Sequence, residues 1–355
     1  MNNRLARLRE LLRETELDSF VVAGAANRYY LSGFTGDNGF LLVDAAEQVL
    51  YTDFRYMEQA RAEAPAFTLC QVGRRILPEF SACLAERGGD RIGFEPDHWS
   101  LADYQELIEV VSEKRLIAQK GMVEGLRAVK DPEEIERIGQ AAAINDRAWA
   151  RLMPLIKPGV AERDLAAELD YLLRREGADG NAFTTIVASG PRGALPHGTA
   201  SARKIAPGDL VVFDFGAQYQ GYASDMTRTV AVGNAGEKER EIYRIVAEAQ
   251  ALALAALRPG LTGIEVDAVA RRHIKDAGYG QYFGHGLGHA VGIEIHEEPR
   301  LSPIGEQVLA AGMVVTVEPG IYLPGLGGVR IEDLVVLTAT GCRNLTNSAK
   351  DMAIL

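Results

Sequence analysis

Apolar residues in the first third of the chain follow two alternating periodicities. Leucines at positions 5, 8, 11 and 12 recur at helical spacing and predict an opening helix. Short apolar runs predict strands at residues 20–23, 40–43, 49–52 and 91–94, and helical patterns occur at 55–63, 77–86 and 102–111. The turn-forming residues at 34–39 predict a loop. This alternation predicts an α/β domain over residues 1–122.

A different pattern begins after residue 122 and predicts a second domain over residues 123–355. Asp131, Pro132 and the two glutamates that follow are typical of a helix start, and the helix should reach about residue 155. The apolar runs at 210–213 and 314–317 have the length and continuity of buried strands.

The second domain repeats itself. Pro-Gly turns at 158–159 and 259–260, 101 residues apart, each open a predicted helix. Further along, Gly208 and Gly312, 104 residues apart, precede apolar runs that each lead to an acid. Because independent landmarks recur at nearly one offset, we expect two equivalent halves related by a pseudo-twofold axis, with their acids facing each other.

Four acids lie at or near the ends of buried strands. Asp214 and Asp225 are separated by a glycine-containing turn at hairpin spacing, and Glu318 and Glu332 are separated by another glycine-rich stretch. An unpaired buried carboxylate costs several kcal/mol, so four of them together require cations. Arg228 and Arg330 lie close to these acids in the sequence and could form ion pairs with them. Two positive charges, however, do not neutralise four acids.

Histidines supply further candidate ligands. Four of the six lie in glycine-rich or acid-rich surroundings, namely His197, His285, His289 and His296. The i,i+4 pair in this set is separated by glycines that argue against a helix, and the Glu of the HExxH zinc motif is missing. Four carboxylates with one or two neutral imidazoles balance two divalent cations. Oxygen-rich ligation favours Mn²⁺, with Co²⁺, Fe²⁺ or Zn²⁺ as alternatives, and a pair of such ions forms a hydrolytic site.

Composition excludes several other classes of protein. The chain has 355 residues, 47% of them hydrophobic and 25% charged, as in soluble globular proteins. A net charge of −11 disfavours nucleic-acid binding. No apolar run approaches the ~18 residues of a membrane span, and charges interrupt the first residues, so we expect a cytoplasmic protein without a membrane partner. The three cysteines form no CxxC motif, which disfavours a thiolate metal site.

The acids and histidines together resemble the ligand signature of the pita-bread metallopeptidases, which include methionine aminopeptidase, aminopeptidase P, prolidase and creatinase. The matching strings are Asp-Phe-Gly at 214–216, Asp-Met-Thr-Arg-Thr at 225–229, Gly-His-Gly-Leu-Gly-His at 284–289, Val-Glu-Pro-Gly at 317–320 and Gly-Val-Arg-Ile-Glu-Asp at 328–333. The resemblance covers the whole chain. It implies an α/β N-terminal domain, typical of the proline-specific branch, followed by an α+β pita-bread domain with an internal pseudo-twofold repeat.

This resemblance also implies roles for individual residues. Asp225 would bind one ion, Asp214 and Glu332 would bridge both, and His289 and Glu318 would bind the other, with Glu318 also carrying a proton. His285 and His296 would contact the substrate and stabilise the tetrahedral intermediate, His197 would line the pocket, and Arg330 and Tyr322 would orient ligands and intermediate. Because all five ligands are present, a metal-free peptide-binding relative and creatinase chemistry are both disfavoured.

The family resemblance implies cleavage of an Xaa-Pro bond. Prolidases cut dipeptides, whereas aminopeptidase P accepts longer peptides. Arg300 follows His296 by four residues and is placed to meet the free carboxylate of a dipeptide, which favours prolidase, although a solvated loop charge is the alternative. Homodimers are usual among the look-alikes, and Asp37 in the 34–39 loop is a further candidate for substrate binding.

Overall fold

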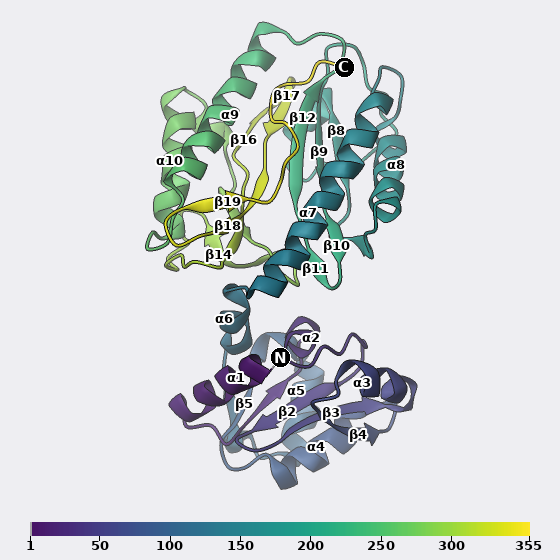
Figure 1. Cartoon of the computed structure of the whole chain (residues 1–355), viewed down its shortest axis with the longest axis vertical. Coiled ribbons are helices and arrows are strands. Elements are labelled where there is room, and N and C mark those ends of the chain that lie inside the picture. Colours follow the sequence, from purple (N-terminus) through teal and green to yellow (C-terminus); the bar gives the residue numbers. More distant parts are fainter. Residues whose placement is uncertain (1) are drawn as a thin grey trace. The chain divides into compact units, whose positions relative to one another are not determined.

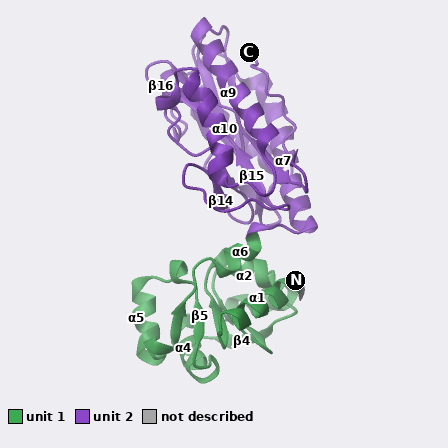
Figure 2. Cartoon of the chain, turned by 90° about the vertical axis from the view of Figure 1, so that its left-hand side faces the viewer, with its two compact units in different colours: residues 1–127 green, residues 128–355 purple. Residues whose placement is uncertain are grey.

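The computed structural model describes residues 2–355 and divides into two compact units, residues 1–127 and 128–355 (Figure 1, Figure 2). The boundary predicted from the sequence falls at the start of α6 (Met122–Ala128), whose last residue is the first of the second unit. Among residues 2–355, none of the helices has both the length and the apolar character that a membrane span requires.

The first unit is built on one mixed sheet in the order β4-β3-β2-β1-β5-β6. Its strands are β1 (Ser19–Val22), β2 (Phe40–Asp44), β3 (Gln48–Asp53), β4 (Thr68–Val72), β5 (Ile92–Phe94) and β6 (Leu116–Ala118). Its helices are α1 (Asn2–Glu14), α2 (Ala25–Ser32), α3 (Met57–Glu63), α4 (Ile76–Arg87) and α5 (Leu101–Val110). The central strands β1, β2 and β3 pair antiparallel, and the outer pairs are parallel. This arrangement confirms the predicted α/β class.

Two details of the first unit differ from the sequence prediction. The helix expected at 55–63 begins as a 3₁₀ turn, η1 (Phe54–Tyr56), because the Asp53 side chain accepts a hydrogen bond from the amide of Arg55 and caps that turn. The short elements α2, β4 and β6 were not predicted. β4 and β6 carry exposed or half-buried residues at most positions, so they lack the apolar run that marks a strand.

Four helices support the second unit: α7 (Pro132–Leu152), α8 (Glu162–Arg175), α9 (Glu237–Ala256) and α10 (Gly263–Asp276). Helix α7 starts with a capping box between Asp131 and Glu134, as the sequence indicates. Helices α8 and α10 begin later than their Pro-Gly turns, because Ala161 and Thr262 have extended backbones and act as N-caps.

The strands of the second unit form several small sheets around one cavity. One sheet has the order β12-β9-β8, with β8 (Ile186–Ser189), β9 (Leu210–Phe215) and β12 (Met226–Ala231). Another has the order β14-β13-β15-β18-β19, with β13 (Gly288–Ala290), β14 (Glu297–Leu301), β15 (Val314–Val317), β18 (Asp333–Leu337) and β19 (Cys342–Asn344). The pair β16 (Gly320–Leu323) and β17 (Gly327–Arg330) and the sheet β11-β10-β7, formed by β7 (Gly180–Asn181), β10 (Ala217–Tyr219) and β11 (Tyr222–Ala223), complete the unit.

The internal repeat is visible in backbone pairing. Ala161 forms an isolated bridge with Lys204, and Thr262 forms the equivalent bridge with Val308. Thr262 follows Ala161 by 101 residues and Val308 follows Lys204 by 104, the same two offsets as in the sequence repeat. The two halves join where the amide of Glu332 donates to the carbonyl of Thr227 over 3.1 Å. This geometry confirms the predicted pseudo-twofold repeat.

The helices cover one face of these sheets and leave the other face to polar side chains. Trp149 of α7 packs on Phe213 and Phe215 of β9, with ring centroids 5.2 and 6.1 Å apart. Because side chains alternate along a strand, Asp214 between these two phenylalanines points to the opposite face. The apolar helical core therefore positions the acid of β9 toward the cavity.

Candidate metal centre

A cavity of about 610 Å³ in the second unit brings together nearly all of the predicted site residues. Its lining includes His197, Asp214, Asp225, His285, His289, His296, Arg300, Glu318, Tyr322, Arg330 and Glu332. Asp37 belongs to the first unit, where its carboxylate accepts a hydrogen bond from the hydroxyl of Tyr56. The substrate contact expected of Asp37 stays a prediction.

The strands deliver the four acids in two symmetric pairs. Asp214 is the last but one residue of β9, near the strand end as the sequence predicts, and Asp225 directly precedes the neighbouring strand β12. Glu318 directly follows β15, and Glu332 directly precedes its antiparallel partner β18. Each half of the repeat therefore contributes two carboxylates from one antiparallel pair of strands.

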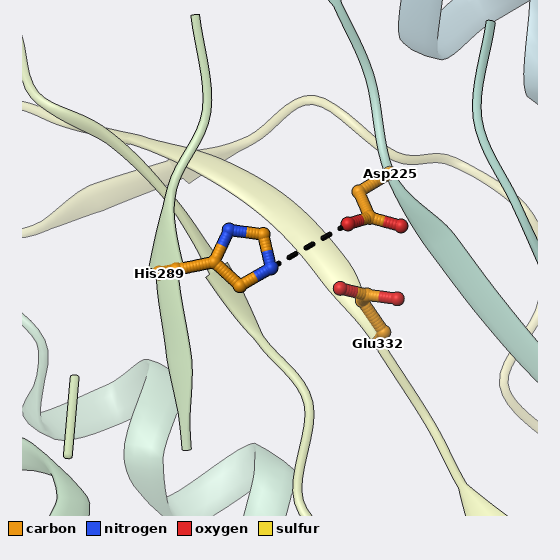
Figure 3. A group of neighbouring side chains, drawn as sticks. All are labelled: Asp225, His289 and Glu332. Carbon is orange, nitrogen blue, oxygen red and sulfur yellow. Dashed lines mark ion pairs between the residues drawn. The ribbon is translucent and has the colours of Figure 1, made fainter. Parts of the chain in front are cut away.

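His289 completes this group from β13. Figure 3 shows its imidazole and the carboxylates of Asp225 and Glu332 turned toward one another, and one ligand atom from each lies within 4.8 Å of the others. The Nε2 atom of His289 is 3.6 Å from Asp225 Oδ2 and 3.3 Å from Glu318 Oε1. Its Nδ1 atom is 3.1 Å from the carbonyl oxygen of Ala290, which accepts a hydrogen bond from that nitrogen. In the neutral ring the Nε2 lone pair therefore faces the carboxylates.

Several carboxylate oxygens at this site lack a hydrogen-bond donor. Asp214 Oδ1, Asp225 Oδ1 and Glu332 Oε1 are buried and have no hydrogen-bond partner among residues 2–355. Buried polar atoms nearly always have a partner, so converging acceptors of this kind require a cation. The residues present therefore fit divalent metal ions bound by carboxylates and one imidazole.

Electrostatics agree with a cation at this position. Burial, followed by the charges of neighbouring acids, raises the pKa of Asp225 and of Glu332 well above the usual values. Burial also raises the pKa of Asp214, although the charge of Arg330 opposes that shift. Burial thus disfavours the charged form of these carboxyls, and bound divalent ions would offset that penalty.

Arg330 links the acids to the predicted substrate-contacting residues. Its Nη2 atom donates to Asp214 Oδ2 over 2.5 Å, and its Nη1 atom donates to the hydroxyl of Tyr322 over 2.7 Å. The hydroxyl of Tyr322 is in turn 2.9 Å from His285 Nε2, and His285 Nδ1 bonds the carbonyl of Gly286. Burial raises the pKa of Tyr322 to about 12 and lowers the pKa of His285. The hydroxyl of Tyr322 therefore keeps its proton and donates a hydrogen bond to Nε2 of His285.

His296, Arg300 and His197 lie at the same cavity. The ring of His296 meets that of His289 edge-on, with centroids 4.4 Å apart, and burial lowers the pKa of His296 to about 4. Arg300 pairs with His289 across β13 and β14, and its side chain is 42% exposed with Nε 3.7 Å from Glu298 Oε1. His197 lines the cavity beside Pro196.

Sequence reasoning missed two threonines that orient the acids. Thr227 Oγ1 donates to Glu332 Oε2 over 2.7 Å and accepts from Arg330 Nε over 3.0 Å. Thr316 Oγ1 donates to Glu318 Oε1 and accepts from the amide of His289, both over 3.1 Å. The available signal was a hydroxyl inside an apolar run, as in Val-Val-Thr-Val at 314–317.

Known proteins resemble this chain over its whole length. The model of metallopeptidase family M24 matches residues 136–339, and that of the creatinase/prolidase N-terminal domain matches residues 4–129. The Xaa-Pro dipeptidase of Pyrococcus furiosus is 42% identical over 355 residues, covering 99% of this chain and 100% of the relative.

Solved structures agree with this resemblance. The structure of an Xaa-Pro dipeptidase from Bacillus anthracis has a TM-score of 0.96 at 43% identity and covers 99% of each chain. That of an X-Pro aminopeptidase from Thermotoga maritima has a TM-score of 0.90 at 38% identity and covers 98% of this chain and 100% of the other. The carboxylate and imidazole donors thus occur in a fold shared with metal-dependent peptidases, and the chain belongs to metallopeptidase family M24, with the pita-bread fold and a creatinase/prolidase N-terminal domain.

Proposed function

We propose that this chain is an Xaa-Pro dipeptidase, which hydrolyses the bond between the first residue of a dipeptide and its proline. The observation that carries the proposal is the convergence of His289 with the buried carboxylates of Asp225 and Glu332. Asp214, Glu318 and Arg300 line the same cavity. The name and the 42% identity of the Pyrococcus furiosus relative support the same substrate class.

We propose that two Mn²⁺ ions bind this centre, held by Asp214, Asp225, His289, Glu318 and Glu332. Four carboxylates balance two divalent charges, and oxygen-rich ligation suits Mn²⁺ better than softer ions. When bound, such ions lower the pKa of a water molecule and polarise the scissile carbonyl.

The side chains of the cavity have the remaining roles in hydrolysis. Glu318 takes the proton of the attacking water and passes it to the proline nitrogen, which requires a proton on leaving. The hydroxyl of Tyr322 donates a hydrogen bond that orients the ring of His285, while Arg330 compensates the charge of Asp214. His285 and His296 contact the reacting carbonyl group, and His197 lines the position of the first residue.

Arg300 supports a dipeptide as substrate. A dipeptide ending in proline presents its carboxylate one residue beyond the scissile bond, and a guanidinium matches a carboxylate with two hydrogen bonds. Since Arg300 lies on β14 beside His289 and lines the cavity, it is suited to this contact. Xaa-Pro aminopeptidase activity on longer peptides is the second candidate, favoured by the likeness to the Thermotoga maritima X-Pro aminopeptidase.

The test compares hydrolysis of Xaa-Pro and Xaa-Pro-Yaa peptides with the same first residue, after chelation and after addition of Mn²⁺, Co²⁺, Zn²⁺ or Fe²⁺. We expect no activity in the chelated protein and the highest kcat/KM on Xaa-Pro with Mn²⁺. A higher kcat/KM on Xaa-Pro-Yaa would establish the aminopeptidase instead. Peptide binding without hydrolysis under every metal would indicate a binding protein.

We also infer a homodimer located in the cytoplasm. The family resemblance supports the dimer, and a composition of 47% hydrophobic and 25% charged residues agrees with the location. Sedimentation velocity of the purified protein and fractionation of the source cells test the two expectations separately.

A further inference from the structure

The segment that carries His285 has no regular structure of its own. Residues 283–287 belong to no helix or strand, and Gly284 and Gly286 lie on either side of the histidine. Glycine gives the backbone more freedom than any other residue, so a histidine in this context is not fixed by its local sequence. Backbone polar groups of such a segment need partners elsewhere when they are buried.

Two side chains of α10 supply these partners. Arg271 donates from Nη1 to the carbonyl of Phe283 over 2.9 Å and from Nη2 to the carbonyl of His285 over 2.7 Å. Asp267 Oδ1 accepts from the amide of Leu287 over 3.0 Å. The backbone is therefore held at the histidine and on both sides of it.

Asp267 and Arg271 also hold each other. They are one helical turn apart and form a bidentate ion pair, with Arg271 Nε 2.7 Å from Oδ2 and Nη2 2.8 Å from Oδ1 of Asp267. The side chain of Asp267 is 2% exposed, and the guanidinium of Arg271 also lies over the ring of Phe283 at 4.3 Å. A bidentate pair with a buried carboxylate has a well-defined geometry, so it transmits the position of the helix to the segment.

The other half of the repeat contains a comparable device. Glu162 begins α8, the counterpart of α10, and is fully buried. Its carboxylate accepts hydrogen bonds from the amides of Ser189 and Ser201, over 2.8 and 3.0 Å. These two serines flank the segment that carries His197. Each half therefore uses a buried helical carboxylate to hold the backbone around a histidine of the cavity.

We propose that Asp267 and Arg271 are positioning residues that fix His285 toward Tyr322 and the substrate. The inference rests on the proposed function only for the choice of substrate in the assay. Neither residue lines the cavity among residues 2–355, so both act through the backbone of 283–287. A displacement of about 1 Å in a catalytic group costs up to about 100-fold in rate.

The test uses the full-length protein with Arg271→Lys, which keeps the charge but loses the planar fork, and with the isosteric Asp267→Asn. The matched control is Arg137→Lys, because Arg137 forms an i,i+4 pair with Glu133 on α7 and its side chain is 28% exposed, close to the 27% of Arg271. Asp267 and Arg271, with the backbone groups that they bind, are called the clamp below. Hydrogen–deuterium exchange of the peptide 283–289 measures how firmly the clamp holds this backbone, without any substrate. We expect at least about 10-fold faster exchange in both variants and none of this change in the control.

Kinetics of Mn²⁺-loaded protein on an Xaa-Pro dipeptide then test the role in the reaction. We expect a fall in kcat of about 10–100-fold for Arg271→Lys, with KM and the metal stoichiometry from calorimetry unchanged. In a His285→Ala background the same substitution should cause no further loss, because both changes remove one function. Losses that multiply in the double variant, or unchanged exchange in the single variants, would overturn the proposal. Failure of the wild-type protein to cleave Xaa-Pro would overturn the proposed function alone, and the exchange measurement would still decide whether the clamp exists.

Discussion

Replacing Asp225 by asparagine should stabilise the metal-free protein, although it removes a metal ligand. Asp225 and Glu332 present ligand atoms within 4.8 Å of one another, and both side chains are buried. In the absence of a cation these carboxylates repel each other and also lose their hydration. Asparagine has the same shape and no charge, so it should relieve the repulsion without opening a void.

The size of the effect follows from this distance. Two unit charges at the upper limit of this separation, 4.8 Å, repel by about 3.5 kcal/mol at an effective dielectric constant of about 20. Because a carboxyl of raised pKa takes up a proton and so avoids the full repulsion, we expect Asp225→Asn to raise the free energy of unfolding by about 1–3 kcal/mol. At about 2–4 °C per kcal/mol for a domain of this size, Tm should rise by about 2–12 °C.

The pH dependence has a defined sign. Burial raises the pKa of Asp225 in the folded protein above that of the unfolded chain, so the folded state binds more protons between the two pKa values. The stability of the metal-free wild-type protein therefore falls as the pH rises through that range. The advantage of Asp225→Asn should be largest at neutral pH and should disappear at about pH 4 and below.

Thermal unfolding of the chelated proteins, followed by circular dichroism at several pH values, measures this difference. Asp351→Asn, at an exposed position of the same unit, is the control and should leave Tm unchanged. Added Mn²⁺ should raise the Tm of the wild-type protein but not that of Asp225→Asn. The reasoning would be refuted if metal-free Asp225→Asn were less stable than wild type at neutral pH. It would also be refuted if the gain in Tm over wild type were as large at pH 4 as at neutral pH.

Three further substitutions test the cavity. His296→Ala should keep the metal content but lower kcat/KM by about 10²–10⁴-fold, whereas His98→Ala in the first unit should change neither, as metal analysis and steady-state kinetics would show. Arg300→Ala should lower kcat/KM about 10–150-fold on Xaa-Pro and less on Xaa-Pro-Yaa, and equal losses on both peptides would make it a structural residue. Tyr322→Phe removes the hydroxyl between Arg330 and His285 and should reduce kcat about 10-fold or more at unchanged metal content, so an unaffected kcat would contradict that link.

The fold class, the internal repeat and the acids of the site follow from local features of the amino-acid sequence. An acid at the end of an apolar run is already unusual, and a repeated Pro-Gly turn marks equivalent helix starts wherever the helices pack. For this reason Asp214, Asp225, Glu318 and Glu332 stand out from the sequence alone. The resemblance to the pita-bread family then supplied their expected roles.

The contacts of Arg228 and Arg330, the two arginines near these acids in the sequence, depend instead on how the strands pair. Arg330 points into the cavity and pairs with Asp214, whereas Arg228 points the opposite way and pairs with Asp333 over 2.8 Å. Thr227 and Thr229, on either side of Arg228, bond to Glu332 and Arg330 instead. The direction of a side chain depends on the pleat and the register of its strand, which are set by neighbouring strands rather than by its own string.

The clamp formed by Asp267 and Arg271 was beyond sequence reasoning for a related reason. An acid and an arginine one turn apart are typical of a solvated helical surface, and the backbone groups that they bind lie 12 to 20 residues further along the chain. Those groups become partners only after α10 packs beside the glycine-rich segment. Sequence identifies which side chains have unusual chemistry, but packing determines which groups they meet.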